Sequence, residues 1–214
     1  MIKVRLEEIN KKIKGNIILS DINIELFGGK IYGLKGQNGC GKTMLMRTIC
    51  GLLLPDSGRV IVNGKVLHVD MDFPDSIGAL IENPAFLPRY SGMDNLRLLA
   101  ALEKKLNIRD VRTAMERVGL NPDDKKIYKK YSLGMKQKLG IANAIMGEPQ
   151  IIILDEPINA LDEDSVAKVK DVLISLRDKD GLIVIACHDK EELEFLSDEI
   201  IEMKEGRIIG RKEL

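Results

Sequence analysis

The chain has 214 residues, with 33 Lys and Arg against 33 Asp and Glu and therefore a formal net charge of zero at neutral pH. This length suffices for one sizeable core, or for a core with a modest subdomain, but not for several independent domains. The balanced charge excludes a global basic field of the kind that drives non-specific nucleic-acid binding, so no nucleic-acid partner is expected.

The start of the chain, MIKVRLEEINKK, is charged throughout and lacks the apolar centre of a signal peptide. The apolar runs of the whole chain, such as GLIVIAC at 181–187, are far shorter than the roughly 20 residues that a membrane-spanning helix needs. The cysteines Cys40, Cys50 and Cys187 are widely spaced and form no CxxC pair, which favours reduced thiols over a zinc site or disulfides. These features predict a cytosolic protein.

Two kinds of strand are predicted in the first part of the chain. Residues 4–13, and residues 59–65 after the turn PDSG, are short segments that alternate apolar and polar side chains, which is typical of an antiparallel accessory sheet. Residues 30–35 (KIYGLK) read instead as a strand covered on both faces, as in a parallel sheet. A helical stretch, residues 43–54, follows it.

Helix-forming residues dominate the middle of the chain. The stretches 93–106, 108–120 and 135–148 each show an apolar stripe at helical spacing. We interpret residues 84–147 as a helical subdomain inserted into an α/β core of residues 1–83 and 148–214. The whole chain, residues 1–214, is then a single domain.

The last part of the chain returns to buried strands. Residues 150–155 (QIIILD) and 181–187 (GLIVIAC) are continuous apolar runs, and residues 162–179 between them show helical spacing after an acidic start. Strand, helix and strand in this order predict a parallel crossover unit. A closing hairpin at 199–210 is assigned to the antiparallel accessory sheet. The predicted class is α/β with a mixed, mainly parallel sheet.

Residues 36–43 carry the phosphate-loop pattern G-x-x-x-x-G-K-T between a predicted strand and a predicted helix. Glycines let successive N–H groups point at phosphate oxygens, and the following helix adds its positive N-terminal end. Lys42 would neutralise the β- and γ-phosphates, and the Thr43 hydroxyl would bind Mg²⁺. Cys40 stands where any small side chain satisfies the loop geometry. The residues expected to bind nucleotide here are Gly36, Gln37, Asn38, Gly39, Cys40, Gly41, Lys42, Thr43 and Met44.

Two adjacent carboxylates, Asp155 and Glu156, end the apolar strand at 150–155. A carboxylate at the end of a parallel strand beside the phosphate loop can hold the metal, which suits Asp155. Glu156 lies one residue further, where it would orient and deprotonate an attacking water. The alternative interpretation is an acidic helix start after a strand.

Five motifs in a fixed order resemble the ATP-binding subunit of an ABC transporter. They are the phosphate loop at 36–43, the signature SLGMKQ at 132–137, the strand that ends in Asp155 and Glu156, the segment NALD at 159–162, and His188 after a strand. The resemblance covers nearly the entire chain and implies the ABC ATPase fold, a P-loop NTPase core that hydrolyses ATP with Mg²⁺. The SLGMKQ form, with IGALIENPAF upstream, is similar to the subgroup linked to bacitracin and lantibiotic export or self-protection.

The signature segment predicts a second anion site. Ser132 and Gly134 precede a helix expected to begin near Met135, so that a hydroxyl and bare N–H groups gather at its N-terminus. Taken alone, the segment is better interpreted as an ordinary capped helix with surface lysines. In the family the phosphate loop of one subunit faces the signature of another, with ATP between them. The resemblance therefore implies a head-to-tail homodimer, or a dimer with a close paralogue.

The resemblance also implies roles for two further residues. His188 contacts the γ-phosphate and helps to place the attacking water, which makes it a catalytic residue beside Glu156. Asp162 spans the dimer near the opposing phosphate loop.

The chain departs from the family at two positions. Glu82 stands where the family usually has Gln, and it adds a negative charge beside phosphate that Mg²⁺ or Lys42 must offset, while still being a candidate metal ligand. Ile13 stands where the family stacks adenine on an aromatic ring. An aliphatic side chain covers the base without that stacking geometry, so weak discrimination between bases is expected.

The chain has the ATPase motifs but no predicted membrane-spanning segment, so the resemblance implies that an integral membrane permease is a separate chain. Binding to that permease would hold this protein at the cytoplasmic, inner face of the cell membrane. Phe86, Leu87 and Tyr90 are candidates for the docking surface, and burial in the helical subdomain is the alternative for them. Two other functions stay open: a soluble ABC ATPase that acts on ribosomes or DNA, and a nucleotide sensor without turnover. The lack of tandem cassettes, coiled coils or basic extensions argues against the first, and Glu156 with His188 argues against the second.

Overall fold

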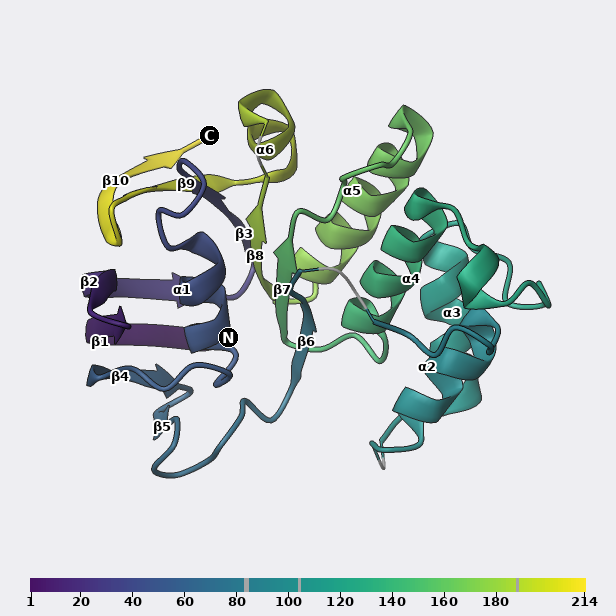
Figure 1. The fold of residues 1–214 in the computed structure, drawn as a ribbon, viewed down its shortest axis with the longest axis horizontal. Coiled ribbons are helices and arrows are strands. Elements are labelled where there is room, and N and C mark those ends of the chain that lie inside the picture. The colour runs from purple at the N-terminus through teal and green to yellow at the C-terminus, as the bar shows by residue number, and fades with distance from the viewer. Residues whose placement is uncertain (83–84, 104, 188) are drawn as a thin grey trace.

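The computed structural model describes residues 1–82, 85–103, 105–187 and 189–214. These residues form two β-sheets on one side of the molecule and a group of helices on the other (Figure 1). In chain order the elements are β1 (Lys3–Ile13), β2 (Asn16–Phe27), β3 (Lys30–Lys35), α1 (Lys42–Ile49), β4 (Ser57–Val62), β5 (Lys65–Val66), β6 (Ile77–Leu80), α2 (Gly92–Ala100), α3 (Ile108–Arg117), a 3₁₀ turn (Tyr128–Lys130), α4 (Leu133–Ile145), β7 (Ile151–Asp155), α5 (Glu163–Arg177), β8 (Leu182–Ala186), α6 (Lys190–Leu196), β9 (Glu199–Lys204) and β10 (Arg207–Glu213).

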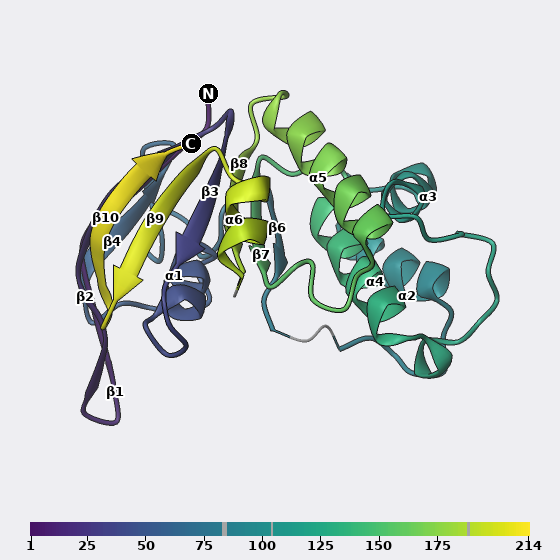
Figure 2. The ribbon, with the colours of Figure 1, turned by 90° about the horizontal axis from the view of Figure 1, so that it is seen from above.

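The smaller sheet is antiparallel, as expected for an accessory sheet. Within the described residues it has four strands in the order β2-β1-β4-β5. Strands β1 and β4 confirm the two alternating segments found in the sequence. Strand β2 was not predicted, although it too alternates buried and exposed residues along much of its length. The β1–β2 hairpin extends beyond the rest of the sheet (Figure 2).

The larger sheet is mixed and mainly parallel. Across the described part of the chain its order is β10-β9-β3-β8-β7-β6, and every pair except β10–β9 is parallel. Strands β3, β7 and β8 confirm the three predicted buried strands, and α5 confirms the crossover helix between β7 and β8. The α/β class with a mainly parallel sheet is therefore confirmed.

The closing hairpin was assigned to the wrong sheet. Strands β9 and β10 do form a hairpin, but β9 pairs in parallel with β3 and so extends the larger sheet. The reason is that β9 is apolar on both faces: Ile200 packs into one core, while Ile201 and Met203 pack into the other. A strand with two apolar faces is stable only where both faces are covered.

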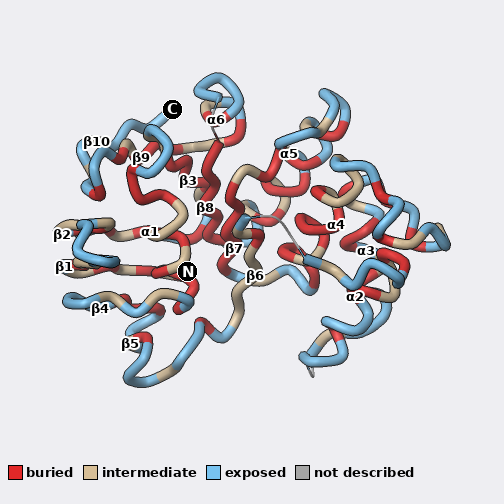
Figure 3. Tube along the Cα trace, viewed as in Figure 1, coloured by how far each residue is buried: buried red, intermediate tan, exposed pale blue. Residues whose placement is uncertain are grey.

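The larger sheet separates two hydrophobic cores. Along β7, Ile151 and Ile153 face the core that contains α1 and the smaller sheet, whereas Ile152 and Leu154 face the core that contains the helices. This alternation follows from the two-residue period of a strand. Burial of one such side chain contributes about 1.5–3 kcal/mol. The central strands are accordingly the most deeply buried part of the chain (Figure 3), and α1 lies between the two sheets (Figure 2).

The helices α2, α3 and α4 lie together beyond the β6 edge of the larger sheet (Figures 1 and 2). All three fall within residues 84–147, the range proposed for the helical subdomain, of which residues 84 and 104 are outside the described residues. Helix α4 begins at Leu133, two residues earlier than expected, because the Ser132 side chain accepts a hydrogen bond from the Met135 N–H and caps the helix. Gly134 therefore lies inside the first turn.

No helix among the described residues combines the length and the apolar composition that crossing a bilayer requires.

Helix α4 packs directly against Gly78 of β6. A Cβ atom at this position would lie 1.7 Å from the Ala144 carbonyl oxygen. We expect Gly78→Ala to lower the free energy of unfolding by about 1–3 kcal/mol, because the helix must move to relieve the overlap. Urea denaturation measures this loss. The control is Gly210→Ala, whose Cβ would meet nothing within 4 Å. Equal denaturation midpoints for the two variants would contradict the close packing.

Candidate active site

The pairing of three parallel strands brings two distant segments to one edge of the larger sheet. In the β3–β8–β7 register, Leu34 pairs with Ala186, and Ala186 pairs with Asp155. The phosphate loop leaves β3 just after Leu34, and Asp155 is the last residue of β7. Both therefore lie at the carboxyl ends of the strands, where open α/β sheets bind their ligands.

The loop at 36–43 has the conformation that phosphate binding needs. Gly41 precedes α1 with φ at 110°, and Gly39 has φ at 79°, both in the region that favours glycine. A Cβ at Gly41 would lie 2.9 Å from the Ile18 carbonyl oxygen, whereas a Cβ at Gly39 would meet nothing within 4 Å. The loop is thus tightly packed on one side and open at its tip. Its open side and the first turn of α1 offer N–H groups to an anion.

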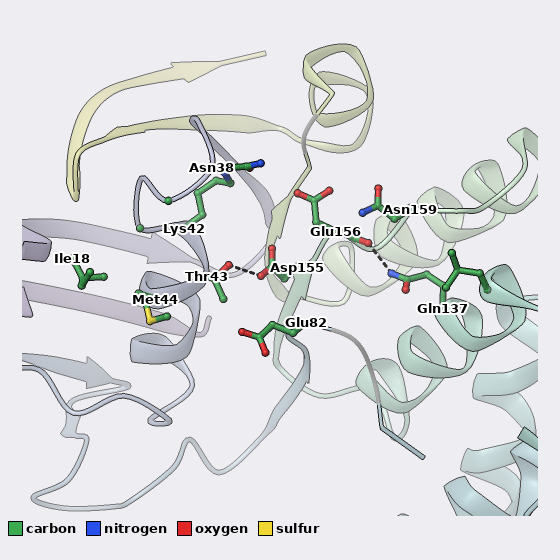
Figure 4. Close-up of a pocket in the computed structure, with 13 residues that line it drawn as sticks. Ile18, Asn38, Lys42, Thr43, Met44, Glu82, Gln137, Asp155, Glu156 and Asn159 are labelled. Atoms are coloured by element: carbon green, nitrogen blue, oxygen red, sulfur yellow. Dashed lines mark hydrogen bonds between the residues drawn. The ribbon is translucent and has the colours of Figure 1, made fainter. Parts of the chain in front are cut away.

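Lys42 is the buried cation of this loop. It is 7% exposed, and its Nζ donates hydrogen bonds to the carbonyl oxygens of Gly36 (2.7 Å) and Gln37 (3.3 Å). Because an ammonium group has three protons, it keeps donor capacity for a phosphate oxygen. Figure 4 shows the side chain above the start of α1, beside the cavity.

Thr43 and Asp155 meet directly. The Thr43 hydroxyl donates a 2.6 Å hydrogen bond to Oδ2 of Asp155, which is 9% exposed (Figure 4). Mg²⁺ prefers hard oxygen ligands, takes one or two from the protein and completes its octahedral shell with water and phosphate oxygens. This pair fits that ion, so both residues remain its candidate ligands.

Glu156 sits directly after the strand in a left-handed backbone conformation, with φ at 52°. Its N–H donates to the Ala186 carbonyl oxygen (2.8 Å), and its own carbonyl accepts a 2.7 Å hydrogen bond from the side-chain amide of Gln137. In Figure 4 the carboxylates of Asp155 and Glu156 both point toward the side of the phosphate loop. The backbone thus turns two successive acidic side chains into one cavity.

Glu82, the departure from the usual Gln, lies across the cavity with φ at 61°. Its carboxylate forms a 2.6 Å ion pair with the Arg47 guanidinium of α1. We expected Mg²⁺ or Lys42 to offset its charge, and the structure adds Arg47, in direct contact with the carboxylate, as a third source of compensation.

These residues surround a cavity of about 670 Å³, a volume typical of nucleotide-sized ligands. Residues from the phosphate loop, α1, β2, α4, the end of β7 and the segments that follow β6 and β7 line it: Ile18, Asn38, Gly39, Gly41, Lys42, Thr43, Met44, Glu82, Leu133, Gln137, Asp155, Glu156 and Asn159. Ile18, Leu133, Gln137 and Asn159 were not among the predicted site residues. Leu133, Gln137 and Asn159 fall in motifs that the sequence displays, whereas Ile18 lies in the strand that was missed.

Ile13, proposed to cover the base, lies elsewhere. It is paired with Asn16 at the end of the β1–β2 hairpin, is 36% exposed, and does not occur among the described residues that line the cavity. Ile18 lines the cavity instead. Ile13 lies at the tip of the β1–β2 hairpin, whereas Ile18 lies further along β2, at the cavity.

Gly36, Gln37 and Cys40 line a second cavity of about 690 Å³ on the other side of the loop, which shares only Asn38 and Gly39 with the first among the described residues. Cys40 is 7% exposed. Burial raises the pKa of the Cys187 thiol, which lines the same cavity, and raises the pKa of Cys50 to about 12. These two thiols are therefore protonated and poorly nucleophilic at neutral pH.

The structure does not bring Ser132 and Gly134 of the signature into the first cavity, although Leu133 and Gln137 of the same motif line it. Ser132 caps α4, and Gly134 packs so closely on the NALD segment that a Cβ would lie 2.8 Å from the Ala160 carbonyl oxygen. Asp162 caps α5, and its hydrogen bonds with Ser165 lower the pKa of its carboxyl group. The described residues that line the first cavity do not include Ser132, Gly134 or Asp162. His188, proposed as catalytic, lies outside the described residues.

The glycine-rich loop precedes a helix and lies beside a strand that ends in acidic residues, on a mainly parallel sheet. This arrangement defines a P-loop nucleotide-binding protein. The family model described as ABC transporter matches residues 19–159. The chain belongs to the ABC transporter family, as an ATP-binding protein of the ATPase class.

Three relatives in bacteria match almost the whole chain. An uncharacterised ABC transporter ATP-binding protein, YybJ of Bacillus subtilis, is 42% identical over 96% of this chain and 94% of its own length. The bacitracin transport ATP-binding protein BcrA of Enterococcus faecalis is 38% identical over 96% of this chain and 68% of its own. The lantibiotic transport ATP-binding protein SrtF of Streptococcus pyogenes is 33% identical over 98% of this chain and 90% of its own.

Solved structures support the same fold. The structure of cbiO1 from Clostridium perfringens, described as part of the transporter complex cbiONQ, has a TM-score of 0.82 and 30% identity over 98% of this chain and 88% of its own. The dimeric structure of the ABC transporter cassette MJ0796 has a TM-score of 0.87 over 99% of this chain and 98% of its own, at 23% identity. The predicted ABC ATPase fold is confirmed.

We expect weak discrimination between nucleotide bases, because the cavity offers an aliphatic side chain rather than an aromatic ring at its mouth. In competition against labelled ATP, GTP should bind within about tenfold of ATP, or roughly 1.4 kcal/mol. The matched variants Ile18→Ala and Ile13→Ala then show which residue covers the base. A hundredfold preference for ATP would contradict the expectation.

Proposed function

We propose that this chain hydrolyses ATP at a site shared between two copies and thereby drives a separate integral membrane permease. The observation that carries the proposal is the direct contact between Thr43 of the phosphate loop and Asp155 at the end of β7, with Glu156 beside them. Membership of the ABC transporter family supports the same function.

The hydrolytic step assigns one role to each group. Glu156 takes a proton from a water molecule, whose oxygen forms a bond to the γ-phosphorus as the bond to the bridging oxygen breaks, releasing ADP and phosphate. Lys42 and the loop N–H groups hold the phosphates. Thr43 and Asp155, with Glu82 nearby, would hold Mg²⁺, which would supply positive charge for the phosphate oxygens. His188 is proposed, from the family resemblance, to help place the water.

A dimer accounts for the position of the signature. The capped N-terminus of α4, with Ser132 and Gly134, is a second place where N–H groups and a hydroxyl meet. Because those residues lie outside the chain's own cavity, we propose that they contact the triphosphate bound to a second copy, or to a close paralogue, in a head-to-tail arrangement. Asp162, whose lowered pKa keeps it charged, would lie near the opposing loop.

The permease is proposed to dock on the segment that follows Glu82. Phe86 is partly buried and packs edge-to-face on Tyr128 at 5.3 Å between ring centroids, so it belongs to the helical core. Leu87 and Tyr90 are 49% and 47% exposed. The buried Asn95 side chain hydrogen-bonds both backbone groups of Leu87. This segment is therefore an apolar surface with a fixed shape, which suits a short helix of a partner.

The transported substrate is proposed from the relatives. BcrA is named for bacitracin transport and SrtF for lantibiotic transport, and both substrates are peptide antibiotics. We therefore propose export of, or resistance to, a compound of this class, by a complex at the inner face of the cell membrane.

The variant Glu156→Gln should lose steady ATP hydrolysis by about a hundredfold or more, because its side chain cannot accept the proton. It should still bind ATP and should accumulate as a dimer at millimolar ATP, which light scattering measures. Lys42→Ala, as the contrasting variant, should lose ATP binding itself. If Glu156→Gln hydrolyses ATP normally, Glu156 is not the base, and if it stays monomeric with ATP bound, the shared site is wrong.

Replacement of Leu87 by Asp should reduce co-purification of the membrane subunit at least about fivefold while ATP binding stays unchanged, because a charge in the apolar contact must be desolvated. Tagged protein from detergent-solubilised membranes, analysed by mass spectrometry, provides the measurement. Leu102→Asp is the control, since Leu102 is 81% exposed on a different segment. Equal recovery of the membrane subunit with both variants would exclude docking at Leu87.

A further inference from the structure

A buried amide joins the helical part of the chain to the acidic end of β7. Gln137 is 8% exposed in the second turn of α4, and its Nε2 donates a 2.7 Å hydrogen bond to the Glu156 carbonyl oxygen. Figure 4 shows this bond crossing from α4 to the loop that follows β7. Gln137 also lines the cavity that contains the Glu156 side chain. It thus reaches the backbone of Glu156 from the helix that carries the signature.

The backbone at Glu156 needs such support. Its φ of 52° lies in the left-handed region, which residues with a side chain seldom adopt and keep only where surrounding contacts hold them. On the strand side, the Glu156 N–H is bonded to Ala186 of β8 at 2.8 Å. On the other side, its carbonyl accepts from Gln137 and, at 3.4 Å, from the Asn159 N–H. The Gln137 bond is the shorter of the two and comes from a different element.

The direction of the Glu156 side chain follows from this backbone. Asp155 is the last residue of a strand, and the next side chain would point to the opposite face of the sheet if the strand continued. The left-handed turn instead sends the Glu156 carboxylate to the same cavity as Asp155 (Figure 4). If the turn relaxes, the carboxylate moves away from the cavity, whereas the phosphate loop and the Thr43–Asp155 contact are unaffected.

We propose that Gln137 is a positioning residue that holds Glu156 in its hydrolytic orientation and makes that orientation depend on the position of α4. Ser132 caps the same helix one turn earlier. A shift of α4 caused by contact at its N-terminus moves the Gln137 amide relative to β7, so occupancy of the signature end is transmitted to the base through one hydrogen bond. This inference rests on the proposed role of Glu156 as the base.

A purely structural role would have a different consequence. A buried amide normally has a hydrogen-bond partner, and its loss destabilises the fold as a whole. Loss of a positioning contact instead lowers the rate of the chemical step while nucleotide binding is kept. A fall in kcat with KM unchanged therefore indicates the positioning role, whereas a loss of stability alone indicates the structural role.

The experiment compares Gln137→Leu, which keeps the bulk but loses the donor, with the wild-type chain. We expect kcat for ATP hydrolysis to fall about tenfold to a hundredfold, as for a misplaced catalytic group, with KM and the equilibrium affinity for ATP changed less than about twofold. Hydrogen exchange of the peptide that covers residues 155–159 should become faster. Asn143→Leu on the same helix, which lines a different cavity, should change none of these quantities.

Two additional variants keep the test decisive. Gln137→Asn retains the amide but is too short to reach the carbonyl, so it should show the same loss of kcat even if Gln137→Leu fails to fold. In a Glu156→Gln background, Gln137→Leu should cause no further loss, because the group that it positions is already inactive.

Unchanged kcat in both Gln137 variants, or a fall in ATP affinity parallel to the fall in kcat, would overturn the proposal. Full hydrolysis by Glu156→Gln alone would instead overturn the role of Glu156. The failure of the positioning role and the failure of the proposed base are thereby separated.

Discussion

The site depends on the register of three adjacent parallel strands. Because β3 and β7 are separated by β8 alone, a loop and a carboxylate that are more than a hundred residues apart in the chain meet at 2.6 Å between Thr43 and Asp155. A slip of one residue in either pairing would turn Asp155 to the other face of the sheet. The apolar side chains on both faces of β7 and β8 oppose such a slip, since each apolar residue of these strands is buried in one of the two cores.

The helical part of the chain is attached to this frame by contacts that leave little freedom. Gly78 lets α4 approach the backbone of β6, and Gly134 lets the start of the same helix approach the segment after β7. Helix α4 therefore packs closely against the segment after β7 near its start and against β6 near its end. Such a helix either moves together with Asp155 and Glu156 or changes its contacts with them. Two alternative packings of this kind are the usual basis of a conformational switch in a protein.

Local patterns predicted the parts of this structure that local forces decide. The continuous apolar runs identified β3, β7 and β8, and the glycine-lysine motif identified the loop, because each needs only its own side chains to be recognised. Strand β9 was misassigned and Ile18 was missed, because both depend on which distant strand lies alongside. The Gln137 contact also joins residues 19 positions apart. Its position in the signature was visible, but its partner, a backbone carbonyl, leaves no trace in the sequence.

The charges around the cavity explain why a divalent cation belongs to the proposed chemistry. Among the described lining residues, Glu82, Asp155 and Glu156 are acidic and Lys42 is basic, so the cavity carries an excess of negative charge before a nucleotide arrives. A triphosphate would be repelled at short range. Arg47 offsets Glu82 through their ion pair, but Asp155 and Glu156 still oppose one lysine. A Mg²⁺ ion held by Asp155 and Thr43 would reverse this balance by adding two positive charges at the cavity. Because Arg47 already pairs with Glu82, the excess that the metal would offset comes from Asp155 and Glu156, and Glu in place of Gln at position 82 adds little to it.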